Sequence, residues 1–385
     1  MGVLRFITSG ESHGPALTAI IEGLPAGIEL DPARINLVLG RRQGGVGRGG
    51  RMKIEKDQVE FLSGVRGGKT LGSPITLRIT NRDWPNWQEV MAQGQEAKLT
   101  ERVITRPRPG HADLAGALKY RQDDIRNILE RSSARETAAR VAVGAVCQQY
   151  LQVFGIRVQG QVSAIGGVKS LIEPKIQPET LYNTPLYCPN PEDTEKMLAE
   201  IAAAQERGDT LGGVVTVIAE GLPIGLGSHV QWDRRLDGRL AQALMSIQGI
   251  KGVEIGLGME TASLPGSAVQ DEIFYDREKG YYHKTNRSGG LEGGISNGES
   301  LVVRAAMKPI PTLVSPLSSV DMKSKEISQA AYERSDVCAV PAAALVAEAA
   351  VAWVLAEAVC EKFAGDHLEE ALDSYKRYLE YLKSR

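Results

Sequence analysis

The chain has 385 residues, of which 42% are hydrophobic and 24% are charged, so it can bury a sizeable core. Its 45 lysine and arginine residues are balanced by 47 aspartate and glutamate residues, and the formal net charge is -2. This balance excludes a protein that coats nucleic acid or an anionic membrane by bulk charge. The positions at which basic residues cluster are therefore more informative about function than their total number.

Helical and strand patterns alternate along the chain. Asp31 followed by Pro32 predicts a helix start, because an aspartate cap and a proline in the first turn are typical there, and this helix runs to about Arg42. Further helices are predicted at 112–129, 133–154 and 341–363, and along a leucine and tyrosine stripe from Leu368 to Leu382. β-branched and polar residues mix as in half-buried antiparallel strands at 75–80, 157–165, 213–222 and 300–307. No clear linker separates these elements, so we predict one integrated α+β domain over residues 1–385.

Two C-terminal segments bear on location and assembly. The apolar stretch 337–359 carries Glu348 and Glu357, which favours a buried helix over a membrane span. The helical tail 364–385 is either a packing face or an oligomer contact. The N-terminus lacks the pattern of a signal peptide, and we expect a cytoplasmic protein.

Four segments hold arginine or histidine among glycine, serine or proline. The first, TSGESHGP at 8–15, places His13 beside Ser12. Histidine is the side chain best suited to proton transfer near neutral pH. Taken alone, this segment equally fits a hydrogen-bonded histidine in a turn.

The second segment is RRQGGVGRGGR at 41–51, with Arg41, Arg42, Arg48 and Arg51. Its glycines allow backbone amides to approach an anion, and guanidinium groups pair with carboxylate and phosphate oxygens. GVGRGG also matches GxGxxG, but it follows a helix and no acidic residue stands near position 65, so a dinucleotide site is not predicted. The alternative is a solvated basic loop.

The third segment, RPRPGHAD at 106–113, carries Arg106, Arg108 and His111 on a backbone stiffened by two prolines. We expect His111 to open a helix whose N-terminus helps to hold an anion. Closely after it, ERSSARET at 130–137 suggests a helix cap at Ser132 and Ser133. A cap alone does not explain the paired Arg131 and Arg135.

The fourth segment, ERSDVCAVP at 333–341, places Arg334 and Asp336 before the alanine-rich helix, where an ordinary cap is the alternative. A neighbouring arginine would keep Asp336 ionised and able to accept a proton. MKPIPT at 307–312 adds Lys308 and Thr312 around a stiff Pro-Ile-Pro. Together the segments predict a polyanionic ligand and histidines that protonate developing charge. No spacing of potential ligands predicts a metal.

These segments together resemble the chorismate synthase family, and the resemblance runs from Phe6 to about Phe363. The longest matches are GESHGPALTAIIEGLPAG at 10–27, ERSSARETAARVAVGAV at 130–146 and RSDVCAVPAAALVAEA at 334–349. The resemblance implies conversion of 5-enolpyruvylshikimate 3-phosphate to chorismate and phosphate, in the shikimate pathway of aromatic amino acid biosynthesis. Formally this is an anti 1,4-elimination that requires reduced FMN with no net redox change. The resemblance also implies a β-α-β sandwich, with helices layered between antiparallel sheets, and a homotetramer.

The resemblance implies roles for individual residues. His13 would protonate the leaving phosphate, His111 the reduced flavin, and Asp336 would move a proton through flavin N5. The implied substrate ligands are Ser12, Arg42, Arg48, Arg51, Arg108, Ser133, Arg135 and Arg334. The implied FMN ligands are Arg131, Ser132, Ser133, Gln248, Gly249, Gly293, Lys308, Pro309, Ile310, Pro311, Thr312 and Arg334. The sequence departs from many relatives at Gly249, where they carry alanine.

Two other functions fit parts of the sequence. An FMN-dependent reductase of a phosphorylated metabolite would share the flavin and the arginines but should also carry a nicotinamide site. An RNA-binding protein with an RGG-like box would need repeats and interleaved aromatic residues, and RGGR occurs once. Two sources of reduced flavin stay open: the enzyme's own use of NADPH, or a separate flavin reductase.

Overall fold

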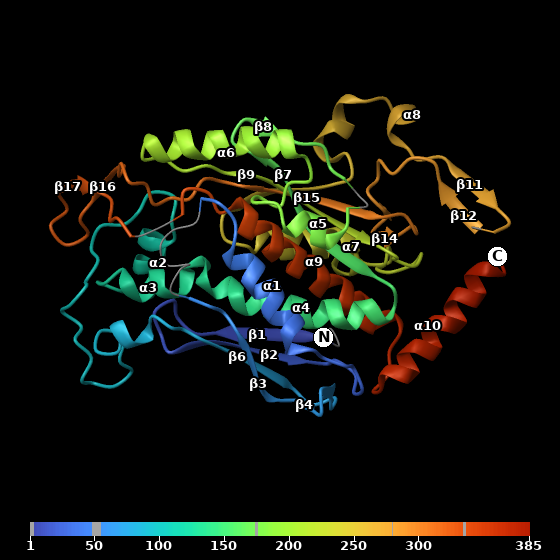
Figure 1. The fold of residues 1–385 in the computed structure, drawn as a ribbon, viewed down its shortest axis with the longest axis horizontal. Helices are drawn as coiled ribbons and strands as arrows, with labels where there is room; N and C mark the ends of the chain where they lie inside the picture. The colour runs from blue at the N-terminus through green and yellow to red at the C-terminus, as the bar shows by residue number, and fades with distance from the viewer. Residues whose placement is uncertain (1–3, 48–54, 174–175, 279, 334–335) are drawn as a thin grey trace.

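The computed structural model describes residues 4–47, 55–173, 176–278, 280–333 and 336–385. Two antiparallel sheets stand on opposite sides of a helical layer (Figure 1). The first sheet has the order β1-β2-β6-β3. Its strands are β1 (Arg5–Ser9), β2 (Ala16–Glu22), β6 (Ile75–Thr80) and β3 (Val59–Ser63).

The second sheet contains the long strands predicted in the middle of the chain. Its order is β10-β15-β9-β7-β8. These strands are β10 (Ile250–Ile255), β15 (Leu301–Met307), β9 (Gly213–Glu220), β7 (Arg157–Ile165) and β8 (Val168–Lys169). The four predicted strands are present, as β6 in the first sheet and β7, β9 and β15 in the second, and the mixed α+β character is confirmed.

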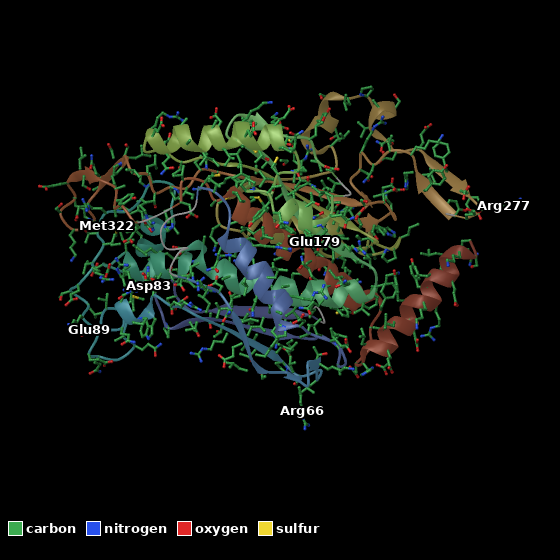
Figure 2. All side chains as sticks on the ribbon, in the orientation of Figure 1. Arg66, Asp83, Glu89, Glu179, Arg277 and Met322 are labelled. Carbon is green, nitrogen blue, oxygen red and sulfur yellow. The ribbon has the colours of Figure 1, made fainter. Side chains whose placement is uncertain are left out.

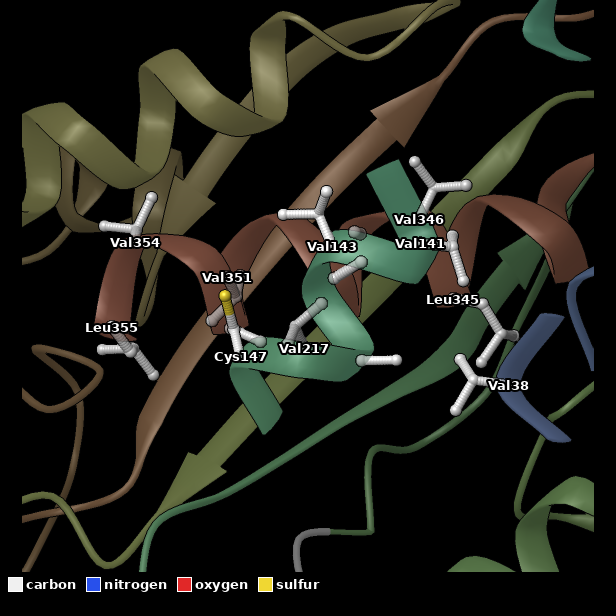
Figure 3. Close-up of a cluster of buried hydrophobic side chains, with 14 of the residues drawn as sticks. Val38, Val141, Val143, Cys147, Val217, Leu345, Val346, Val351, Val354 and Leu355 are labelled. Carbon is white, nitrogen blue, oxygen red and sulfur yellow. The ribbon is translucent and has the colours of Figure 1, made fainter. Parts of the chain in front are cut away.

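Three helices fill the space between the sheets: α1 (Pro32–Gln43), α4 (Thr137–Val153) and α9 (Val340–Lys362). α4 contacts β2 and β6 of the first sheet, whereas α9 contacts β7 and β9 of the second. The two helices approach so closely that a Cβ at Gly144 would lie 2.3 Å from the Cβ of Ala349. In Figure 3, apolar side chains of α4, including Val143 and Cys147, meet those of α9 and β9 in a tightly packed core.

The alanine-rich helix α9 is the one helix of the described residues that is long and apolar enough to cross a membrane. However, 83% of its most apolar window is buried inside the protein. Even its acidic Glu348 is buried. This confirms the prediction of a buried core helix.

The helix predicted over 112–129 is instead two helices, α2 (Asp113–Tyr120) and α3 (Arg126–Ser132). Arg121 has a φ of 54°, which ends α2 in the left-handed region. The carboxylate of Asp124 then accepts the amides of Ile104 and Arg126, and these bonds fix the start of α3. α2 also begins at Asp113, two residues after His111, so the prediction that His111 opens the helix was wrong by half a turn.

The remaining elements lie around this sandwich of sheets and helices. In Figure 1, α2, α3, β16 and β17 lie at one end of the molecule, and α10 with β11 and β12 at the other. The shorter strands are β4 (Val65–Arg66), β5 (Lys69–Thr70), β11 (Ile273–Asp276), β12 (Gly280–His283), β13 (Leu291–Glu292), β14 (Ile295–Ser296), β16 (Ser318–Val320) and β17 (Ile327–Gln329). The other α-helices are α5 (Pro178–Tyr182), α6 (Pro191–Glu206), α7 (Leu236–Met245), α8 (Gly266–Val269) and α10 (Leu368–Lys383).

Candidate active site

His13 lies in the turn between β1 and β2 and is held by Glu130 from α3. The Nδ1 atom of His13 lies 2.8 Å from Oε1 of Glu130 and 2.9 Å from Oε2. The backbone amide of His13 donates to the same carboxylate at 2.8 Å, and the amide of Ser12 donates to the Glu130 carbonyl at 2.9 Å. Glu130 therefore fixes both the ring and the backbone of this turn.

An aromatic ring covers one face of His13. Trp87 stacks on the imidazole with ring centroids 3.8 Å apart and an interplanar angle of 25°. The indole is itself held, because its Nε1 donates to Asp83, labelled in Figure 2, and the guanidinium groups of Arg102 and Arg126 lie over it. The stacked indole limits rotation of the imidazole ring.

The carboxylate of Glu130 is ionised at neutral pH. Burial raises its pKa, but the hydrogen bonds and charge of His13 and the Arg126 guanidinium outweigh burial, and the pKa lies below its ordinary value. Nη1 of Arg126 lies 3.1 Å from Oε1 of Glu130. Glu130 therefore lies between two basic side chains.

A buried ionic cluster lies beside this turn. Nη1 of Arg135 contacts both oxygens of Asp57 at 2.7 Å, and Arg42 approaches the same carboxylate at 3.7 Å. Asn81 accepts two bonds from Arg135 and donates to the carbonyls of Glu11 and Gly14 around His13. Arg135 is thus connected to the histidine turn through Asn81, and Asp57 balances part of the charge of both Arg42 and Arg135.

His111 is held in a similar way by Asp113 at the start of α2. The Nδ1 atom of His111 lies 2.5 Å from Oδ1 of Asp113, and Nε of Arg108 lies 2.8 Å from Oδ2. Burial raises the pKa of Asp113, yet hydrogen bonds and charge from His111 and Arg108 hold it well below the ordinary range. Nη1 of Arg108 also donates to Thr312 at 3.1 Å.

The segment MKPIPT connects the residues around His111 with the loop that follows α7. Lys308 donates from Nζ to the carbonyl of Gly110, and its backbone amide donates to the carbonyl of Gly249 at 2.9 Å. The neighbouring Gln248 donates to Glu136 at 2.6 Å. Segments near 110, 249 and 308 therefore meet in space.

The other predicted residues lie in several places. Ser133 caps the turn before α4 through the amide of Arg135, whereas the hydroxyl of Ser132 bonds within α3 to Ile128. Thus Ser133, and not Ser132, is the cap. Arg131 donates to Thr8 and Gly10 at the end of β1.

The segment that carries Asp336 adjoins the arginine and glycine segment. The amide of Val337 donates to the carbonyl of Gly47 at 2.8 Å. Arg48, Arg51 and Arg334 lie outside the described residues.

Gly293 is not brought to either histidine group. It lies in the turn between β13 and β14, which Figure 1 places well away from α2 and α3. Its carbonyl accepts a bond from Arg235, at the start of α7.

Sequence reasoning missed the acids and the indole that organise this site. Asp113 stands two residues from His111, so its role was readable from the motif. Glu130 and Trp87 lie far from His13 in sequence, and Asp57 lies far from Arg135. Only the fold brings these three residues to their partners.

Comparison with known proteins identifies the family. A family model described as chorismate synthase matches residues 4–360. Proteins named chorismate synthase from Desulforamulus reducens and Moorella thermoacetica are each 61% identical to this chain. The alignments cover 96% and 98% of the chain, and 96% and 100% of the relatives. The chain belongs to the chorismate synthase family.

A solved structure agrees with this assignment to the chorismate synthase family. It is described as a crystal structure of chorismate synthase and shares 47% sequence identity with this chain. The TM-score is 0.79, and the match covers 99% of both chains. The described site thus lies on a fold shared with this family over nearly the whole chain.

Proposed function

We infer that this chain is a carbon–oxygen lyase that converts 5-enolpyruvylshikimate 3-phosphate to chorismate and phosphate in the shikimate pathway. The observation that carries this conclusion is the similarity to proteins named chorismate synthase along nearly the full length of the chain. Two histidines, each held by an ionised carboxylate, suit a reaction in which protons must be placed on leaving or developing charge.

The substrate carries one phosphate and two carboxylates, which gives the arginine-rich segments a target. We propose Ser12, Arg42, Arg48, Arg51, Arg108, Ser133, Arg135 and Arg334 as its ligands. Of these, Arg108 has its guanidinium ordered by Asp113 and Thr312. Preordered guanidinium groups lose little side-chain entropy when an anion binds, which supports this assignment.

The proposed proton transfers use His13, His111 and Asp336. His13 donates to the phosphate oxygen as the carbon–oxygen bond breaks, and His111 would protonate reduced flavin when it is bound. Asp336 would take up, by way of flavin N5, the proton that the elimination removes from a substrate carbon. The arrangement of His13 supports its part, because Nδ1 is occupied by Glu130 and the opposite ring nitrogen remains for the phosphate.

Reduced FMN, when bound, would supply an electron that assists departure of phosphate, with no net redox change over the reaction. The proposed ligands are Arg131–Ser133, Gln248–Gly249, Lys308–Thr312 and Arg334. Gly293 lies away from both histidine groups (Figure 1) and is not proposed as a ligand. The donor chemistry fits, since an ammonium, a guanidinium, an amide and hydroxyl groups suit a flavin phosphate and ring carbonyls. Either NADPH used by this enzyme or a separate flavin reductase supplies the reduced form.

We further propose that residues 1–385 form one catalytic domain with the β-α-β sandwich of the family, working in the cytoplasm as a homotetramer. The tail 364–385 packs against the core through Tyr375 and Tyr378, whose hydroxyls donate to Phe154 and Ile224. Its outer side, with Tyr381 49% exposed, is the part available for an oligomer contact.

An anaerobic assay with chemically reduced FMN tests the function. We expect one phosphate and one chorismate per substrate consumed, with the reduced flavin recovered. Stoichiometric oxidation of the flavin would instead establish the alternative, an FMN-dependent reductase of a phosphorylated metabolite.

A further inference from the structure

We propose that Glu130 is a positioning residue for His13, which fixes the tautomer of the imidazole and stabilises its protonated form. The proposal rests on the acid role given to His13 above. Glu130 receives no role from the family resemblance or from any motif in the sequence. It is assigned here from the contacts of its carboxylate.

The first argument is geometric. Both oxygens of Glu130 lie within 2.9 Å of Nδ1 of His13, and Oε2 also accepts the backbone amide of the same residue at 2.8 Å. The ring and its backbone are therefore fixed by one carboxylate. The Glu130 side chain is only 1% exposed and that of His13 is 12% exposed, so water competes little for these bonds.

The second argument is the charge state of Glu130. Arg126 contacts its carboxylate at 3.1 Å and helps to keep it ionised. An ionised carboxylate only accepts hydrogen bonds, so Nδ1 of His13 must be the donor. When the ring is doubly protonated, the proton that can leave is the one on Nε2. Its transfer breaks the Nε2–H bond, forms an O–H bond on the phosphate, and leaves a neutral ring with Nδ1 still protonated.

The third argument is the environment of the ring. Trp87 covers one face of His13 with centroids 3.8 Å apart, which limits rotation of the imidazole. Arg126 contacts Glu130 and also lies over the same indole. One arginine therefore supports both partners of the histidine.

The same arrangement recurs at His111. Asp113 accepts from its Nδ1 atom and from Arg108, just as Glu130 contacts His13 and Arg126. Two histidines on different segments each have a buried carboxylate held by an arginine. A single such contact fits an ordinary structural role, whereas the recurrence at both proposed acids points to proton chemistry.

The test compares E130Q and E130D with E333Q as a matched control. Glu333 also pairs with Arg126, at 3.4 Å, so E333Q removes a charge from the same arginine while leaving the carboxylate on His13 in place. With reduced FMN supplied, we expect E130Q to lower kcat about 10- to 100-fold, which is part of the contribution of a general acid, with little change in KM. In a plot of kcat against pH, the alkaline limb of E130Q should move to lower pH, because an amide does not stabilise an imidazolium. E130D should keep the position of that limb, and E333Q should match the parent protein.

A second readout does not depend on turnover. In protein labelled with ¹⁵N-histidine, the signals absent from His13→Ala identify His13. We expect the Nδ1–H tautomer in the parent protein and in E130D, and loss of that preference in E130Q. The parent spectrum decides the tautomer even if E130Q fails to fold.

Three results would overturn the proposal: an Nε2–H tautomer in the parent protein, an unchanged tautomer in E130Q, or a reduced kcat in E130Q with an unmoved alkaline limb. If His13 is not the acid, the results differ from these three. In that case His13→Ala keeps its turnover, while the ¹⁵N spectra still report whether Glu130 fixes the ring.

Discussion

Nη1 of Arg135 lies 2.7 Å from each carboxylate oxygen of Asp57, and both side chains are buried. The arginine-rich segments are therefore not a simple basic surface. Part of their charge is balanced inside the protein by Asp57, which Arg42 also approaches. A proposed anion site is thus built beside buried acids that hold its guanidinium groups in place.

Loss of Asp57 should destabilise the protein strongly. Asp57→Asn removes the nearest carboxylate from the buried guanidinium of Arg135 and leaves the more distant Glu55 at 3.7 Å, and we expect the free energy of unfolding to fall by about 3–5 kcal/mol. Urea denaturation measures the change. Glu60→Gln is the control, because Glu60 and Arg78 form an exposed pair at 3.7 Å and its loss should cost less than about 1 kcal/mol. Equal effects of the two substitutions would contradict this prediction.

Acid should weaken the fold through Glu130 and Asp113. The pKa of each is lower in the folded protein than its ordinary value, 4.5 for Glu130 and 3.8 for Asp113. Their contributions to stability are therefore complete above these ordinary values and are lost as the pH falls through the folded values. Unfolding free energies between pH 6 and pH 3 should fall less steeply in E130Q than in the parent protein. Identical slopes would show that Glu130 does not titrate differently in the two states.

Glu348 should have the opposite dependence on pH. Burial in α9 raises its pKa despite hydrogen bonds from Tyr182, Gly160 and Gln148. A raised pKa means that its contribution is present at low pH and is lost as the pH rises through the folded value. The stability of Glu348→Gln relative to the parent protein should therefore increase from pH 4 to pH 8. Glu195→Gln, on the exposed side of α6, should show no such trend, and a flat difference for Glu348→Gln would contradict the prediction.

The sequence predicted the long elements well because their patterns are local. Asp31 does accept the amide of Ala33 at the start of α1, and the strand at 75–80 has the bounds expected. The predicted helix at 112–129 was wrong because its apolar pattern continues across a break. The break is set by the left-handed Arg121 and by Asp124, whose carboxylate accepts the backbone amide of Arg126 at the start of α3.

The site was only partly predictable for a related reason. His13, His111 and Arg108 stand in recognisable motifs, but the carboxylates that control them come from the three-dimensional fold. Glu130 is 117 residues from His13 in sequence, and Asp57 is 78 residues from Arg135. A single sequence does not indicate such pairings, since any of the 47 acidic residues is a candidate partner.

The measurement that tests the account most directly is turnover of His13→Ala and His111→Ala, assayed separately with reduced FMN supplied. We predict that each loses at least about 100-fold in kcat, because each removes a group that donates a proton, while the Kd for 5-enolpyruvylshikimate 3-phosphate changes little. Near-normal turnover in both variants would contradict the acid roles assigned to the two histidines.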